Sequence, residues 1–275
     1  DLAMDPKEFL QKNDLDGALS TIQETIRANP SEAKHRIFLF QLLCIMGDWK
    51  RAVTQLKVSA ELDPLALMMA QTYREGIICE VYREKVFAGE KVPLIFGEPE
   101  DWMAPLLEAL NMHAQGNVTQ AGELRTKAFE LAPTMSGEIN GTSFEWISDA
   151  DMRLGPILEI VVDGKYYWMP FTSIKSMTIE PPVDLRDSVW MPASIKLNNG
   201  GDIVSLIPTR YSGSEKSADP KIKLSKVTDW LAIGEEAYSG LGQRILATDD
   251  GDVAIMDIRT LMMNQPEATD KGNNA

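Results

Sequence analysis

Histidine and cysteine are both scarce in this sequence, which has two of each in 275 residues. Neither His35 nor His113 has a second histidine at helical spacing, and Cys44 and Cys79 do not form a Cys-x-x-Cys pair. Zinc sites are typically built from such pairs, so we predict no metal site, and no motif calls for a cofactor. Two isolated thiols in apolar stretches indicate buried packing roles and a reducing compartment.

Long apolar runs and positive charge are also lacking. No stretch approaches the ~18–20 consecutive apolar residues of a membrane span, and no charged-then-apolar leader is visible. The net charge is −14 and there is no basic stripe, which argues against nucleic acid and anionic membranes as partners. We therefore expect a cytoplasmic protein that favours partners with a basic face.

Two fragments of ligand-binding motifs are incomplete. Gly240-Leu241-Gly242 lacks the third glycine and the strand–turn–helix context of a dinucleotide loop. Asp249-Asp250-Gly251-Asp252 lacks the 12-residue spacing and terminal glutamate of a calcium loop. We interpret the second fragment as a hairpin turn.

The sequence does contain an internal repeat. Asn13-Asp14-Leu15-Asp16-Gly17-Ala18 is answered 34 residues later by Gly47-Asp48-Trp49-Lys50-Arg51-Ala52, and Asn29-Pro30 by Asp63-Pro64. A third copy, Gly116-Asn117-Val118-Thr119-Gln120-Ala121, follows close to two periods further on. This period and these positions are typical of tetratricopeptide (TPR) repeats, which stack helix pairs into a surface that holds another protein.

Residues 1–134 are accordingly predicted to form a TPR-like helical domain. The third unit is irregular: one long helix over 65–88 runs into a segment, 89–99, whose prolines and glycines break any partner helix. Helices resume over 100–115 and 118–131. We expect the irregular unit to form the seam with the second half of the chain.

Residues 135–265 are predicted to form a mostly antiparallel β domain, either a sheet or a small, partly closed barrel. Three hairpins are expected from alternating patterns around turn residues. A further strand is expected at 173–179, a polar mobile loop at 211–223, and a disordered tail at 266–275. The predicted fold class is α+β, and the predicted hairpins cover 157–169, 189–207 and 244–258.

Several phrases carry a family resemblance. They are Gly97-Glu98-Pro99-Glu100-Asp101-Trp102, Asp151-Met152-Arg153-Leu154-Gly155-Pro156-Ile157-Leu158-Glu159, Gly164-Lys165-Tyr166-Tyr167-Trp168-Met169-Pro170, Pro181-Pro182-Val183-Asp184-Leu185-Arg186-Asp187 and Trp190-Met191-Pro192-Ala193. In this order and spacing, the chain resembles the ImpE/SciE (TagJ-like) family over nearly its whole length. The resemblance implies an accessory protein of bacterial type VI secretion. It implies binding to a helical segment of the small subunit of the contractile sheath, and a link to the AAA+ ATPase that disassembles the sheath.

The repeats suit such a partner, because a helical groove can hold an amphipathic helix. In TPR-like repeats the first helix of each pair lines the concave side. The predicted groove residues are Lys34, Ile37, Gln41 and Cys44 from the second unit, with Met69, Tyr73 and Arg74 from the third.

Four charged residues inside the family phrases form a second candidate set: Arg153, Glu159, Arg186 and Asp187. We favour a structural cluster that holds the β domain against the repeats, and we predict no catalytic residues. The alternative is an enzyme with a site at this domain junction, which a raised carboxylate pKa in a pocket would support. A third hypothesis is a scaffold whose repeat ends stack between subunits.

Overall fold

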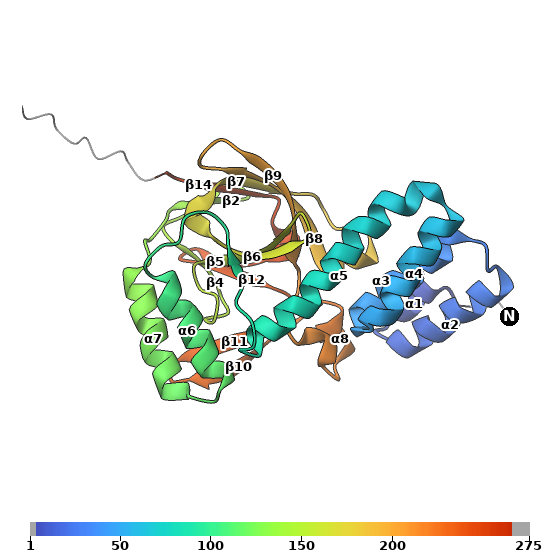
Figure 1. Ribbon diagram of the computed structural model, residues 1–275, viewed down its shortest axis with the longest axis horizontal. Helices are drawn as coiled ribbons and strands as arrows, with labels where there is room; N and C mark the ends of the chain where they lie inside the picture. The colour runs from blue at the N-terminus through green and yellow to red at the C-terminus, as the bar shows by residue number, and fades with distance from the viewer. Residues whose placement is uncertain (1–3, 266–275) are drawn as a thin grey trace, which may run out of the picture.

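The structure is a computed structural model that describes residues 4–265. Within these residues, the first half is helical (Figure 1). Its helices are α1 (Pro6–Gln11), α2 (Leu15–Ala28), α3 (Ala33–Met46), α4 (Trp49–Leu62), α5 (Leu67–Phe87), α6 (Met103–Ala114) and α7 (Val118–Leu131).

The repeated residues have the same structural role in each copy, capping a helix or allowing two helices to pack closely. Asp14 caps α2 by accepting a hydrogen bond from the backbone N–H of Gly17, and Asp48 caps α4 in the same way through Arg51. Gly47 ends α3 in the left-handed conformation that glycine tolerates best. Ala18 and Ala52 are fully buried, so only a small side chain fits where the paired helices meet.

The third repeat has one helix instead of two. After the 21-residue α5, the chain enters a loop and contributes β1 (Leu94–Ile95), which joins the main sheet parallel to β6. Helices α6 and α7 pair with each other and lie against the β half rather than on the outer side of α5 (Figure 1).

The second half is dominated by a nine-stranded open sheet in the order β1-β6-β5-β9-β8-β7-β14-β2-β3, antiparallel except for β1. Two smaller sheets, β10-β11 and β13-β12-β4, flank it. The strands are β2 (Gly137–Ile139), β3 (Thr142–Phe144), β4 (Ile147–Asp149), β5 (Ile157–Val162), β6 (Lys165–Pro170), β7 (Ile174–Ile179), β8 (Trp190–Leu197), β9 (Asp202–Pro208), β10 (Thr228–Gly234), β11 (Ala237–Gly242), β12 (Ile245–Thr248), β13 (Gly251–Ala254) and β14 (Thr260–Met263). The predicted α+β class is confirmed, with an open sheet rather than a barrel.

The predicted hairpins are present as β5–β6, β8–β9 and β12–β13. The strand predicted to reach residue 258 ends at Ala254, where a 3-10 turn, η5 (Ile255–Asp257), begins. The prediction of a polar mobile loop at 211–223 is also wrong. This segment contains η4 (Ser214–Lys216) and α8 (Pro220–Lys223), and it is anchored by buried Ser214 and Ile222. The predicted tail lies outside the described residues.

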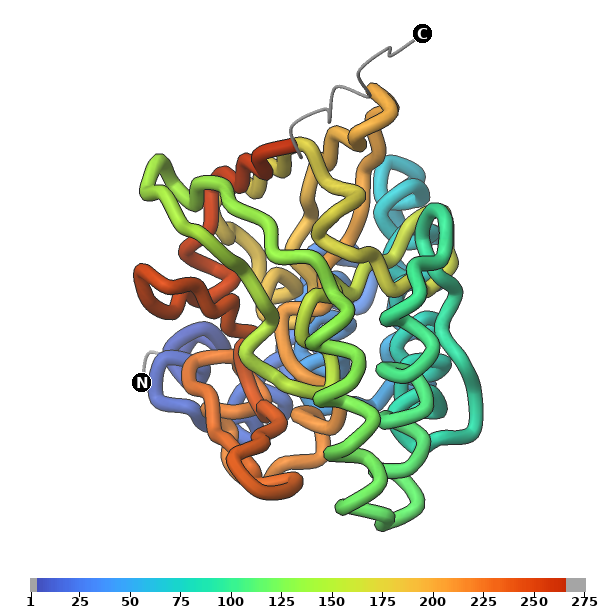
Figure 2. Tube along the Cα trace, turned by 90° about the vertical axis from the view of Figure 1, so that its left-hand side faces the viewer, coloured from blue at the N-terminus to red at the C-terminus, as the bar shows by residue number. Residues whose placement is uncertain are grey.

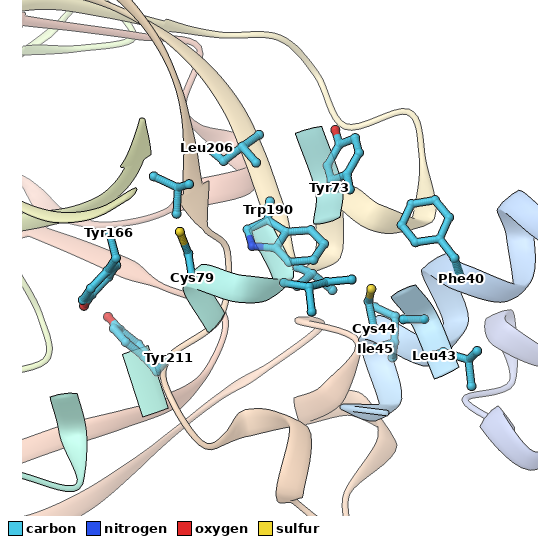
Figure 3. Packing of buried hydrophobic residues seen from close by; sticks show 14 of the residues in the cluster. Phe40, Leu43, Cys44, Ile45, Tyr73, Cys79, Tyr166, Trp190, Leu206 and Tyr211 are labelled. Carbon is cyan, nitrogen blue, oxygen red and sulfur yellow. The ribbon is translucent and has the colours of Figure 1, made fainter. Parts of the chain in front are cut away.

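The two halves share one apolar core. The Trp190 ring of β8 packs against the rings of Trp49 and Tyr73 of the repeats. The same cluster runs on from Tyr73 to Phe40 (Figure 3). Part of the C-terminal half, drawn in orange, lies beside the blue N-terminal helices (Figure 2). There the Lys226 ammonium donates to the backbone carbonyl of Leu10. A second cluster fills the other face of the sheet. None of the helices within residues 4–265 combines the length and apolar character needed to cross a bilayer.

Candidate functional site

An open pocket of about 670 Å³ lies among α1, α2 and α3, on the side of the repeats that was predicted to be concave, and is called the concave pocket below. Lys34, Ile37 and Gln41 of α3 line it, together with residues of α1 and α2. The segment Val183–Leu185, which comes from the β domain, closes one side. The pocket therefore mixes apolar walls with charged side chains of both signs, Lys7 and Lys34 beside Asp5 and Asp184, which suits an amphipathic helix.

The β domain covers part of the predicted groove. The Gln41 side-chain oxygen accepts a hydrogen bond of 2.8 Å from the backbone N–H of Arg186, which lies in η3 (Leu185–Ser188). The Arg186 guanidinium lies over the Tyr73 ring, 4.7 Å from its centroid. Tyr73 is buried, and burial raises its pKa. The groove prediction for Tyr73 therefore needs correction, because residues distant in sequence cover this stretch of helix.

The other predicted groove residues separate in space. Cys44 is completely buried, and burial raises its thiol pKa, so it does not face a groove. Met69 is half-buried against the core. Arg74 is exposed and lines a different pocket, between α4 and α5, with Lys57. The predicted groove residues thus do not form one surface: some line the concave pocket, Arg74 lines the pocket between α4 and α5, and others are buried in the core.

The seam between the two halves is a buried ion network centred on Glu159 of β5. Arg83 of α5 donates from Nε to one Glu159 oxygen at 2.6 Å and from Nη2 to the other at 2.8 Å. Arg244 and the Tyr166 hydroxyl donate to the same carboxylate. Burial alone would raise the pKa of Glu159, but Arg83 and Arg244 outweigh it and hold that pKa below its ordinary range.

A second buried carboxylate adjoins the first. Asp149 accepts from Arg244 Nη1 at 2.6 Å and from the Tyr211 hydroxyl at 2.7 Å. Burial raises the pKa of Asp149 to about 6, in spite of the opposing charge of Arg244. Since both Glu159 oxygens and both Asp149 oxygens are held by donors, the network has the form of a structural tie.

The four charged residues predicted to form one cluster do not. Arg153 forms an ion pair with Asp151 at 2.6 Å and lies over the Phe87 ring. Arg186 pairs with Asp184 in η3. Asp187 caps that same turn by accepting from backbone N–H groups. Only Glu159 occupies the centre of the seam.

Sequence reasoning missed the arginines that hold Glu159. Arg83 lies on the buried side of α5, between Cys79 and Val86. A cation on an otherwise apolar helical face predicts a buried ion pair, because buried charges require partners, so Arg83 could have been identified from the sequence. Arg244 carries no such signal, since it precedes a short strand.

Within residues 4–265, no group of three His, Cys, Asp or Glu side chains is placed to hold a metal ion. The fold and seam define a helical-repeat protein joined to an antiparallel β domain through a sealed, charged interface. A family model described as ImpE protein matches residues 141–262.

Relatives cover the full architecture. The chain is 46% identical over 267 residues to the type VI secretion system accessory component TagJ of Pseudomonas aeruginosa, covering 97% of this chain and 94% of that protein. The crystal structure of protein VPA1032 from Vibrio parahaemolyticus matches with a TM-score of 0.86 at 30% identity, over 95% of this chain and 98% of that one. The chain belongs to the ImpE family.

Proposed function

We propose that this protein is a non-catalytic adaptor of bacterial type VI secretion. In this proposal the repeat domain binds a helical segment of the small subunit of the contractile sheath. The adaptor thereby assists turnover of the sheath by its AAA+ ATPase, in the cytoplasm. The observation that carries the proposal is the 46% identity to an accessory component of type VI secretion along nearly the entire chain.

The repeat half supports a binding role. It leaves two open pockets of about 670 Å³ each, one on the concave side and one between α4 and α5. Each combines aliphatic side chains with charged ones: Lys7, Lys34, Asp5 and Asp184 in the first, and Lys57, Arg74 and Glu61 in the second. An amphipathic helix complements such surfaces, and the excess of cations in the second pocket favours acidic residues on the helix that binds there.

The seam supports a non-catalytic role. A general acid or base needs an oxygen that can reach a substrate proton. The Glu159 carboxylate is fully buried and bonded to Arg83, Arg244 and Tyr166. This arrangement favours a tie between the halves over an active site.

Calorimetry on the full chain tests the proposal. The probe is a synthetic peptide that covers the N-terminal helical segment of the cognate small sheath subunit. We expect micromolar or tighter binding. Lys34→Glu should weaken it if the guest lies in the pocket of α3, and Arg74→Glu if the guest lies along α5, because each variant puts an acid where the guest's acids would lie. Absence of binding to the folded wild type would contradict the adaptor proposal.

A further inference from the structure

Helix α5 is the first helix of a repeat whose second helix is missing. In the second repeat, α3 and α4 pack along each other, whereas the chain after α5 departs into a loop and β1. Solenoid ends normally carry a polar outer face, because an uncapped end exposes apolar surface. Here the end carries exposed apolar side chains, including Leu65 at 92% and Met68 at 82% exposure.

A regular stripe runs along the outer side of α5. Its members follow one another at steps of four and three residues, and all are exposed: Leu67, Gln71, Arg74, Ile78, Val81 and Lys85. This alternation is the spacing of a seam along which a second helix packs. The apolar members are substantially open, with Leu67 at 59% and Ile78 at 53% exposure.

One pocket is lined by members of the stripe, and another lies on a neighbouring face near the end of α5. The pocket between α4 and α5 adjoins Leu67 and Arg74. A second pocket, of about 460 Å³, lies beside Tyr82 and Val86, where α6 and the loop at 89–93 approach α5. The 21 residues of α5 span about 32 Å at the usual rise per residue. The track is thus long enough for a guest helix of some five to six turns.

We propose that a helix from a partner protein lies along this stripe and supplies the missing second helix of the third repeat. The inference rests on the proposed function, whose guest helix is the occupant. The guest has an aliphatic seam that packs on Leu67, Ile78 and Val81.

The charged side chains along the α5 stripe, which we call the α5 seat, indicate which polar residues the guest helix carries. Arg74 and Lys85 are the charged members of the stripe. Lys57 and Glu61 of α4 line the same pocket as Arg74, so cations outnumber anions there by two to one. Two cations and no anion on one helical stripe are notable in a chain of net charge −14. The guest therefore carries acidic residues beside its aliphatic seam.

Residues of the β domain already cover part of the concave pocket, whereas the α5 seat is uncovered. Val183–Leu185 and η3 lie against the concave pocket, and they hold Gln41 and Tyr73. By contrast, the stripe on α5 stays exposed from Leu67 to Lys85. The stripe therefore offers a guest of five turns a continuous exposed face along α5.

The test measures binding of the same sheath-subunit peptide to the full chain carrying single substitutions. Ile78→Asp and Arg74→Glu are expected to weaken binding by at least about tenfold, a loss of 1.4 kcal/mol or more. Val204→Asp is the matched control, since Val204 is a 77% exposed aliphatic residue on β9, and it is expected to bind within about twofold of wild type. Circular dichroism and the thermal midpoint establish that each variant is folded.

The outcomes separate the two proposals. A loss confined to Lys34→Glu and Ile37→Asp, with Ile78→Asp binding like wild type, would overturn the α5 seat and leave the adaptor function standing. If the folded wild type binds no peptide at all, the adaptor function fails, and the seat loses its occupant with it. A peptide whose acidic residues are changed to lysine should bind Arg74→Glu better than it binds wild type, which a merely structural effect of Arg74 would not produce.

Discussion

Arg83 and Glu159 join the helical and β halves through two parallel hydrogen bonds, of 2.6 and 2.8 Å, in a site closed to solvent. The bidentate geometry matches the planar guanidinium to both carboxylate oxygens. Arg83 lies on α5 and Glu159 on strand β5 of the nine-stranded sheet, so the pair fixes the long helix to the sheet. The angle at which α5 presents its outer stripe depends on this tie.

Glu159→Gln is expected to destabilise the protein by about 3–5 kcal/mol, because Arg83 and Arg244 lose the buried carboxylate that they share and keep only Glu80 and Asp149 as countercharges. Urea unfolding followed by circular dichroism measures the change. Arg51→Ala is the control, since Arg51 pairs with Asp48 on the surface and exposed pairs contribute about 0–1 kcal/mol. Equal losses in the two variants would contradict the tie.

Asp149 is expected to make stability depend on pH in the mildly acidic range. Burial raises its pKa to about 6 from the ordinary value of 3.8, so the native state binds more protons than the unfolded chain between these values. The contribution of this carboxyl to stability therefore falls as the pH rises from about 4 to 6. Relative to Asp149→Asn, which stays neutral, the wild type should lose roughly 2–3 kcal/mol between pH 4 and 7.

Urea unfolding of both proteins at half-unit pH steps measures that difference. Glu159 acts in the opposite direction, since its pKa is held down by Arg83 and Arg244. Its contribution is present at neutral pH and is lost as the pH falls below the ordinary glutamate range. A difference between wild type and Asp149→Asn that does not change with pH would show that Asp149 titrates normally.

The fold was largely predictable because its signals are local. A 34-residue period specifies helix pairs by itself, and turn pairs such as Asp163-Gly164 specify hairpins, here with positive φ at both residues. Short strands without a tight turn escaped prediction. The β10–β11 hairpin was missed because β10 exposes Trp230 and Leu231, which gives no inward–outward alternation.

The site was less predictable because it depends on contacts between distant residues. Nothing around Gln41 or Tyr73 indicates that Arg186, more than 100 residues away, covers them. Likewise, Arg153 and Glu159 lie close together in the sequence, but Glu159 pairs with Arg83, 76 residues upstream. Period and turn chemistry specify elements, whereas tertiary packing decides which faces remain open.

Gly76 allows α5 to approach the β domain closely. A Cβ at this position would lie 3.3 Å from the Trp190 ring, so Gly76→Leu is expected to push the helix from β8 and cost about 1–3 kcal/mol. Gly122 is the matched control, because it also lies in a helix but a Cβ there meets nothing within 4 Å. Gly122→Leu should raise stability by about 0.5–1 kcal/mol through helix propensity. Thermal midpoints measure both changes, and a stabilised Gly76→Leu would contradict the close approach.

Arg125 provides the opposite test to Arg83. It is a buried arginine of α7 at 3% exposure, and its Nε has no hydrogen-bond partner among the described residues. Burial lowers its pKa, as does nearby Arg153, while Asp151 acts against both. Arg125→Met keeps the apolar stem and removes a poorly compensated charge, so it should leave stability unchanged or raise it by about 1 kcal/mol or more.

Arg83→Met, by contrast, breaks a satisfied pair and should cost about 3–5 kcal/mol. Urea unfolding of the two variants side by side therefore distinguishes a buried arginine that ties the halves together from one that is only accommodated. A loss above about 2 kcal/mol for Arg125→Met would mean that Arg125 has gained a countercharge in solution. In that case α7, like α5, would be held to the β half by charge rather than by apolar packing alone.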